Sequence, residues 1–253
     1  MNEMEQPTTD NVKFSVIIPA HNEEEYIGKC LDSILEAAKR CEGQVEIIVV
    51  LNRCTDQTEE IAKSYNCITI KNNDKNLSKI RNAGARIARG DILVTIDADS
   101  RMAPHMLYKA DKYLSSGRYI GGGVSGVFDR TSLGIIVSTM ALAIPIVLKY
   151  GTKSVGIFWC YRKDFEAING FNEERFMAVD ADFANRLEKW GKKNKKRYGT
   201  IPFAMITSSR KFDRYGDWFL IKNPETIKAY LKGTNSEQAR ELYYDYENKH
   251  EEK

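Results

Sequence analysis

Two carboxylates stand one residue apart directly after a short apolar run in the middle of the chain. The run covers residues 92–96, and Asp97 and Asp99 follow it. Because side chains alternate across a strand, we expect both carboxylates to leave the strand end on the same side. Hard cations such as Mg²⁺ or Mn²⁺ accept carboxylate and phosphate oxygens together, so the pair could hold a nucleotide diphosphate through a divalent cation. A strand that ends in a polar turn explains the same residues.

The segments around this pair alternate between apolar runs and amphipathic stretches. The apolar runs predict strands at 14–19, 45–51, 67–70 and 92–96. Helices are predicted from an N-cap at Asn22, with three glutamates in its first turn, and at 56–65, 78–88 and 104–114. Continuous apolar strands that alternate with helices indicate an α/β fold with a mostly parallel nucleotide-binding sheet flanked by helices. Ligands bind such sheets at the carboxyl ends of the strands, where Asp97 and Asp99 lie.

The regular alternation of apolar strands and helices ends after Gly117. The sequence predicts strands at 119–128 and 154–161, helices at 164–169 and 180–190, and a charged helical segment from Pro224 onward. Residues 133–148 carry no charge and include Pro145, and the stretch is short for a membrane span, so a buried or interfacial helix is favoured over a transmembrane one.

Length and composition set further limits. A chain of 253 residues can form one large domain or a domain with a small appendage, and a net charge of +3 gives no reason to expect a nucleic-acid partner. The five cysteines are odd in number and never in C-x-x-C spacing, so neither a zinc ribbon nor a disulfide framework is indicated, and a reducing cytoplasm fits best. Residues 1–12 lack the features of a secretory signal, so we expect a disordered tail.

Four motifs occur in a fixed order: residues 19–24 after the first strand, 52–58 after the second, 81–84 in the third helix, and 97–99 after the fourth strand. Each is weak alone, but the ordered set resembles family 2 glycosyltransferases with the GT-A fold. The resemblance covers residues 13–215, divided into a nucleotide-sugar-binding half (13–116) and a smaller acceptor half (117–215), with 216–253 as a helical extension. It implies a UDP- or GDP-sugar donor and an Mn²⁺ or Mg²⁺ cofactor.

The resemblance also implies roles for individual residues toward the donor. The nucleotide would contact the first two motifs, through Pro19, Ala20, His21, Glu23, Asn52 and Asp56. The D-x-D motif would be Asp97, Ala98 and Asp99, with Asp99 the more direct ligand of the cation. Arg81 would add a positive contact, the alternative being a charge on a helix surface. Arg210 and Lys211 would contact phosphate oxygens, the alternative being a basic surface strand.

Residues 159–173 resemble the family segment that precedes the catalytic acidic residue, and residues 179–182 fall where the family usually has Glu-Asp-x-Asp or Glu-Asp-x-Glu. By position Asp180 would be the general base that deprotonates the acceptor hydroxyl in an inverting displacement, with Asp182 as second choice or supporting group. Both residues could instead simply cap the following helix. The absence of Gln-x-x-Arg-Trp after Asp180 argues against a processive synthase.

The sequence departs from the family pattern at Asn52, where an acidic residue usually recognises uracil, and at Val179, which replaces an acid. The identity of the base therefore stays open. A nucleotidyltransferase and a degenerate GT-A binding or scaffold module are the alternatives to a glycosyltransferase. Residues 121–126 match G-x-G-x-x-G, but no clear helix follows, so we expect close backbone packing near the acceptor site. The basic run at 192–197 is a solvated loop or, with the uncharged stretch, a peripheral contact with anionic lipid. The acceptor is unknown, and a lipid-linked one is an open option.

Overall fold

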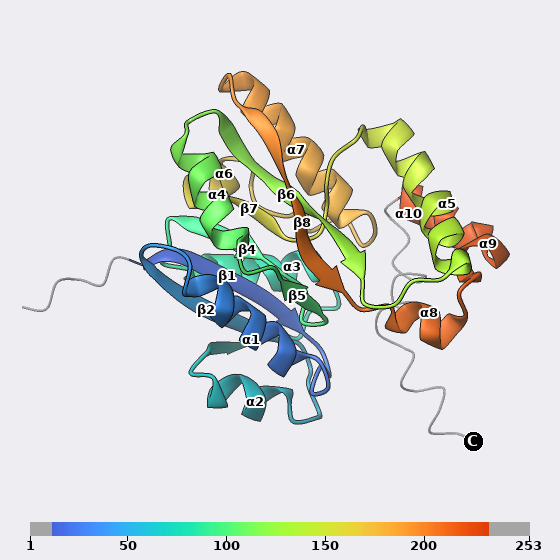
Figure 1. Cartoon of the computed structure of the whole chain (residues 1–253), viewed down its shortest axis with the longest axis horizontal. Helices are drawn as coiled ribbons and strands as arrows, with labels where there is room; N and C mark the ends of the chain where they lie inside the picture. The colour runs from blue at the N-terminus through green and yellow to red at the C-terminus, as the bar shows by residue number, and fades with distance from the viewer. Residues whose placement is uncertain (1–11, 233–253) are drawn as a thin grey trace, which may run out of the picture.

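The computed structural model describes residues 12–232, which form one eight-stranded sheet with helices on both faces (Figure 1). The strand order is β3-β2-β1-β4-β7-β6-β8-β5. The bounds of the strands are β1 Val12–Ala20, β2 Gln44–Leu51, β3 Ile68–Lys71, β4 Ile92–Thr95, β5 Ser100–Met102, β6 Tyr119–Phe128, β7 Phe158–Tyr161 and β8 Arg197–Thr207. The first four are mutually parallel, which confirms the predicted α/β class and its parallel nucleotide-binding half.

Helices connect these strands. Their bounds are α1 Ile27–Ala38, α2 Thr58–Ser64, α3 Leu77–Ile87, α4 Met106–Ser115, α5 Leu133–Tyr150, α6 Arg162–Ala167, α7 Val179–Lys193, α8 Arg210–Tyr215, α9 Phe219–Lys222 and α10 Pro224–Lys232. The predicted helix from Pro224 lies within the described residues as far as α10, and the rest of that prediction lies outside them.

The side chains of β1 alternate between two hydrophobic cores, one on each face of the sheet. Val16 and Ile18 pack with residues of α1 and α4 on one face of the sheet, whereas Ile17 packs with residues of α3 and α7 on the other. All three side chains are fully buried. The alternation of side chains along a strand therefore explains why the sequence of β1 is apolar at every position from 16 to 18.

The beginning of α1 differs from the prediction. Asn22 does not cap the helix: it has a positive φ of 50°, and its side-chain oxygen accepts a hydrogen bond from the backbone nitrogen of Thr55 at 2.8 Å. The residues that follow form a turn in which the Glu23 carbonyl accepts from the amides of Tyr26 and Ile27. Helix α1 begins only at Ile27, so the predicted glutamates precede it and extend the loop at the end of β1.

The second half of the sheet is mixed, which the sequence did not indicate. Strand β7 runs antiparallel to both β4 and β6, and β6 runs parallel to β8. Strands β5 and β8 were not predicted, and they pair antiparallel with each other. Because β5 comes directly after the D-x-D motif, this pairing fixes the motif between β4 and the far edge of the sheet.

The glycines of β6 serve close strand packing. A Cβ atom on Gly122 would lie 2.0 Å from the carbonyl oxygen of Gly199 on β8, a distance that no side chain tolerates. The indole of Trp159 on β7 donates a hydrogen bond to the Gly123 carbonyl at 3.1 Å. The expected backbone crowding in the G-x-G-x-x-G segment is therefore confirmed, while its place near an acceptor stays a prediction.

Helix α5 contains the uncharged stretch and includes Pro145 within it. Together with α8, α9 and α10 it forms a group of helices beside one end of the sheet (Figure 1). Among the described residues no helix combines the length and the apolar character that a membrane crossing requires.

Candidate active site

The carboxyl ends of β1 and β4 border a cavity of about 450 Å³, closed on its other sides by the beginnings of α3, α7 and α8 and by part of α5. The lining contains eleven of the residues singled out from the sequence: Pro19, Ala20, His21, Glu23, Asn52, Asp97, Ala98, Asp99, Asp180, Arg210 and Lys211. This volume is in the range of small-ligand sites. Segments separated by more than 150 residues in the sequence thus contribute to one cavity.

A buried arginine joins two of these carboxylates. The guanidinium of Arg81 donates to Asp97 Oδ1 and to Asp180 Oδ1, at 2.6 Å in each case. Arg81 is 1% exposed and its guanidinium carbon lies 5.1 Å from the centre of the Phe171 ring. The alternative of a helix-surface charge is therefore wrong, because Arg81 lies beneath the cavity and links the D-x-D motif to the beginning of α7.

The two carboxylates joined by Arg81 respond differently to their surroundings. Burial raises the pKa of Asp97, but the charge and hydrogen bond of Arg81 outweigh it, and the net shift is downward. Burial also raises the pKa of Asp180; Arg81 opposes this while the negative charge of Asp97 adds to it, and the net shift is upward. Both side chains stay open to the cavity, with 49% of Asp97 and 36% of Asp180 exposed. Asp97 therefore has the lower pKa of the two and stays ionised more readily than Asp180.

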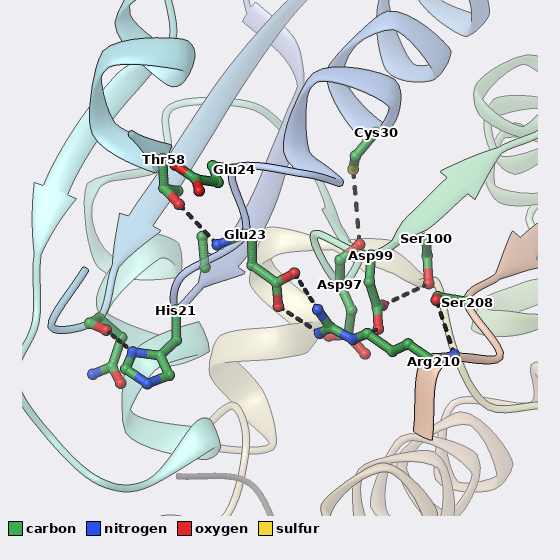
Figure 2. A network of polar contacts seen from close by, with 12 residues as sticks. His21, Glu23, Glu24, Cys30, Thr58, Asp97, Asp99, Ser100, Ser208 and Arg210 are labelled. Atoms are coloured by element: carbon green, nitrogen blue, oxygen red, sulfur yellow. Dashed lines mark hydrogen bonds and ion pairs between the residues drawn. The ribbon is translucent and has the colours of Figure 1, made fainter. Parts of the chain in front are cut away.

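A second arginine links the other two acidic residues of the cavity. Arg210 donates to both oxygens of Glu23, at 2.7 and 2.6 Å, and its Nε lies 3.2 Å from Asp99 Oδ2 (Figure 2). The guanidinium carbon also lies 4.8 Å from the centre of the Tyr26 ring. Arg210 is the first residue of α8, so the basic-strand alternative for this segment is wrong.

Burial controls the ionisation of the acids around Arg210. It raises the pKa of Glu23 to about 7, although the hydrogen bonds and charge of Arg210 oppose the shift. It also raises the pKa of Asp99, where Arg210 opposes the shift and the neighbouring charge of Asp97 adds to it. A cation in this part of the cavity would relieve the repulsion between these carboxylates.

The D-x-D motif forms a turn rather than an extension of β4. The amide of Ser100 donates to the Asp97 carbonyl at 3.0 Å, and the hydroxyl of Ser100 donates to Asp99 Oδ1 at 3.4 Å. Residues 12–232 contain no cluster of three or more Asp, Glu, His or Cys side chains placed to hold a metal. Asp97 is 49% exposed, whereas Asp99 is 16% exposed and pairs with Arg210. Carboxylates of this kind are suitable ligands for a hard cation whose remaining ligands are phosphate oxygens and water.

At the end of β2, the side chain of Asn52 is hydrogen-bonded to the loop that follows β3. Its amide nitrogen donates to the carbonyls of Asn72 at 2.6 Å and Asp74 at 2.8 Å, and the residue is 1% exposed. The Asn52 carbonyl lies 2.6 Å from Nδ1 of His21. An ionised carboxylate could not donate either amide hydrogen bond, so the amide at this position has a structural reason.

Besides the buried Arg81, two predicted residues, Asp56 and Asp182, do not reach the cavity lining. Asp56 accepts from the amides of Thr58 and Glu24 at 3.0 Å each, and so stabilises the beginning of α2. Asp182 pairs with Arg175 at 3.2 Å and with Arg186 at 2.7 Å. The capping alternative for the two aspartates of α7 is wrong, because Ala178 is the N-cap and no side chain caps it.

Other cavity residues had no predicted role in the site, although Val179 and Arg214 belong to segments singled out from the sequence. They come from the beginning of α3 (Lys75, Asn76, Leu77 and Ile80), from α5 and the loop after it (Leu142, Ile146 and Val155), from the approach to α7 (Phe176, Met177, Ala178, Val179 and Ala181), and from α8 (Arg214 and Tyr215). The uncharged stretch of the sequence was the signal for the α5 residues, since an apolar helix of that length must cover something. No local pattern marks the residues before α7.

Comparisons with known proteins agree with this geometry. Glycosyltransferase GlyA of Streptococcus pneumoniae is 34% identical over 92 residues, which cover 34% of this chain and 13% of that protein. The poly(ribitol-phosphate) β-N-acetylglucosaminyltransferase TarS of Staphylococcus aureus is 30% identical over 109 residues, or 41% of this chain and 19% of TarS. Matched segments span 13% to 38% of the length of such curated relatives.

Solved structures share the fold at low sequence identity. The S. aureus TarS fragment crystallised with UDP-GlcNAc has a TM-score of 0.61 at 17% identity, covering 94% of this chain and 72% of that one. Glucosyl-3-phosphoglycerate synthase of Mycobacterium tuberculosis, in complex with Mn²⁺, UDP and glucosyl-3-phosphoglycerate, has a TM-score of 0.55 at 19% identity, covering 85% and 80%. Both neighbours have the GT-A type of fold.

The sequence profile described as "Glycosyl transferase family 2" matches residues 15–188, from β1 to the body of α7. This match covers more than half of the chain and includes all four ordered motifs together with Asp180. The chain belongs to glycosyl transferase family 2.

Proposed function

We propose that this chain is a metal-dependent, inverting and non-processive glycosyltransferase that moves a sugar from a nucleotide-sugar donor to an acceptor hydroxyl. The observation that carries the proposal is the Arg81 bridge, which holds the D-x-D carboxylate Asp97 and the candidate base Asp180 on one guanidinium. The acceptor oxygen and the donor diphosphate both bond to the anomeric carbon during the reaction. The Arg81 bridge fixes the positions of Asp97 and Asp180 relative to each other, as this requires.

The donor diphosphate would lie among the residues at the ends of β1 and β4 and the beginning of α8. Asp97 and Asp99 would hold Mn²⁺ or Mg²⁺, which when bound neutralises charge on the departing diphosphate. Arg210 and Lys211 line the same cavity and would contact phosphate oxygens. The solved neighbours that bind UDP or UDP-GlcNAc, one of them with Mn²⁺, support a nucleotide-sugar donor and a cation.

Asp180 would act as the general base. Its carboxylate is exposed to the cavity, and its raised pKa makes it a better proton acceptor than an ordinary aspartate. Arg81 keeps it oriented and stays charged when Asp180 takes the proton. Asp182 is the weaker candidate because two arginines occupy its oxygens outside the cavity lining.

The identity of the nucleotide base follows less directly from the site. The Asn52 amide is committed to the loop at 72–74, so recognition of uracil by an acid at this position does not apply here. We propose UDP-sugars as the first donors to test, on the strength of the UDP-binding neighbours, and GDP-sugars as the second. A cytoplasmic location and a peripheral membrane contact stay predictions.

The test is nucleotide release from a panel of UDP- and GDP-sugars with Mn²⁺, with Mg²⁺ and with EDTA. We expect slow hydrolysis of at least one donor, loss of it with EDTA, and a decrease of about 100-fold or more in Asp99→Ala. Asp91→Ala is the matched control, because Asp91 is exposed at the opposite end of β4. If no sugar nucleotide binds or is turned over, the proposal is wrong.

A further inference from the structure

Part of the cavity wall is apolar and has no role in the chemistry described so far. Leu142 and Ile146 come from α5, Val155 from the loop after it, and Phe176 and Met177 from the segment before α7. None of the five belongs to the two hydrophobic cores that pack against the sheet. Leu142, Ile146, Val155 and Phe176 therefore line the cavity without being part of a buried core, whereas Met177 is only 1% exposed.

Helix α5 presents different side chains to the cavity and to solvent. Leu142 and Ile146 are four residues apart, which places them on one face of a helix, and both line the cavity. Met140 and Ile144 each stand two residues away, about 200° around the helix, and are 54% and 53% exposed. The cavity-facing pair is thus separate from the exposed stripe on the far side of the same helix.

The apolar wall adjoins the candidate base. Phe176 and Met177 precede Asp180 by only a few residues, and the chain turns between them at Ala178, which has a left-handed φ of 52°. Ala178 and Val179 also line the cavity. An oxygen that approaches Asp180 therefore has apolar side chains beside it.

We propose that this wall is an acceptor subsite for an alkyl or isoprenoid-type chain attached next to the acceptor hydroxyl, an inference that rests on the proposed function. Burial of apolar carbon against Leu142, Ile146 and Phe176 is favourable, whereas a densely hydroxylated acceptor would leave its hydroxyl groups without partners there. In the reaction the acceptor oxygen bonds to the anomeric carbon, the bond from that carbon to the donor phosphate oxygen breaks, and the hydroxyl proton passes to Asp180.

The probe is a series of straight-chain primary alcohols from ethanol to octanol, bound to the full chain in the presence of UDP and Mn²⁺. Calorimetry or ligand-observed NMR gives the dissociation constants. We expect the affinity to increase roughly fourfold for each methylene until the chain fills the wall, since this is the gain for burying one methylene group. Affinity that does not depend on chain length overturns the inference.

A matched pair of variants on α5 locates the binding. Ile146→Asn changes the cavity face and is expected to weaken octanol binding at least tenfold, whereas Ile144→Asn changes the exposed face and is expected to leave it within twofold. The melting temperature and circular dichroism of both variants check that each is folded. If Ile144→Asn weakens binding as much as Ile146→Asn, the alcohol binds the outer stripe and the subsite is wrong.

Donor hydrolysis without an acceptor separates this inference from the proposed function. Ile144→Asn is expected to hydrolyse the nucleotide sugar at the wild-type rate, because Ile144 is exposed and does not line the cavity. Hydrolysis together with a flat alcohol series contradicts the subsite alone. Absence of any nucleotide-sugar binding, with chain-length-dependent alcohol binding that Ile146→Asn removes, contradicts the proposed function and supports the apolar site.

Discussion

The two halves of the sheet supply the cavity in different ways. In the parallel half, side chains come from short loops that follow β1, β2 and β4, so their position is set by the strand ends. In the mixed half, the candidate functional side chains come instead from the beginnings of two helices: α7 follows the connection at 168–178, and α8 follows β8 after only Ser208 and Ser209. Strand ends thus position the residues proposed to bind the donor, and helix beginnings position the proposed base Asp180 and the cation Arg210.

Two arginines connect the halves in opposite directions. Arg81 belongs to α3 in the parallel half and reaches Asp180 of α7, whereas Arg210 belongs to α8 and reaches back to Glu23 and Asp99. The strands interleave as well, because β4 pairs with β7 and β5 pairs with β8. The two halves therefore depend on each other, and variants at these links test whether each half has the role assigned to it.

The largest effect is expected from Asp180→Asn, which removes the candidate base from the mixed half. We expect kcat to decrease by about 10²–10⁴-fold, the usual contribution of general base catalysis, while UDP binding with Mn²⁺ is unchanged. Steady-state kinetics and calorimetry measure the two quantities. Asp182→Asn is the control and is expected to keep turnover within a few-fold; a reversed pattern would assign the base to Asp182.

The next largest effect is expected on stability, from the loss of the buried Arg81 side chain of α3. Arg81→Met leaves Asp97 and Asp180 without their shared cation, and we expect the free energy of unfolding to decrease by about 3–5 kcal/mol, as when one partner of a buried ion pair is removed. Urea unfolding measures this. Arg86→Met on the same helix is the control, because the Arg86 side chain is 63% exposed and its loss is expected to cost under about 0.5 kcal/mol. Equal effects would mean that the Arg81 bridge does not stabilise the protein.

The difference between the two halves also explains which strands and site residues could be predicted from the sequence and which could not. In the parallel half, apolar runs and short connections predicted β1 to β4 and α3 to within about two residues, and the ordered motifs placed Asp97, Asp99 and Glu23 at the cavity. In the mixed half, β5 and β8 were missed because a three-residue strand has almost no periodicity and β8 carries Gly199 and Pro202. Their identity as strands depends on long-range pairing.

Side-chain partners were the least predictable feature of the site. The type of Arg81 and of Asn52 was noted, but a sequence does not show that the first is buried between two carboxylates or that the second holds a neighbouring loop. Asp56 and Asp182 illustrate the converse. Each occurs in a motif at suitable spacing, yet each side chain is occupied by partners outside the cavity.

The ion pair between Arg210 of α8 and the buried Glu23 predicts a pH dependence of stability. The pKa of Glu23 is about 7 in the folded protein and 4.5 without its surroundings, so the folded state binds more protons between these values. Stability from this group is therefore greatest below pH 4.5 and is lost as pH rises to 7, by about 3 kcal/mol. Glu23→Gln is expected to remove this slope in urea unfolding, whereas Glu36→Gln, which alters an exposed acid with a lowered pKa, is expected to keep it. A Glu23→Gln slope equal to that of wild type would contradict the raised pKa.

The smallest effect tests the end of β2 in the parallel half. Asn52→Asp would restore the acid usual in the family, but a carboxylate cannot donate to the carbonyls of Asn72 and Asp74, and it would place a negative charge beside them. We expect the free energy of unfolding to decrease by about 1–3 kcal/mol, with no gain in UDP affinity by calorimetry. Asn73→Asp adds the same charge to an exposed position of the same loop and is expected to be neutral. If Asn52→Asp were as stable as wild type and bound UDP more tightly, base recognition rather than loop support would be the role of this position, and the strand ends of the parallel half would determine the nucleotide as well as hold the diphosphate.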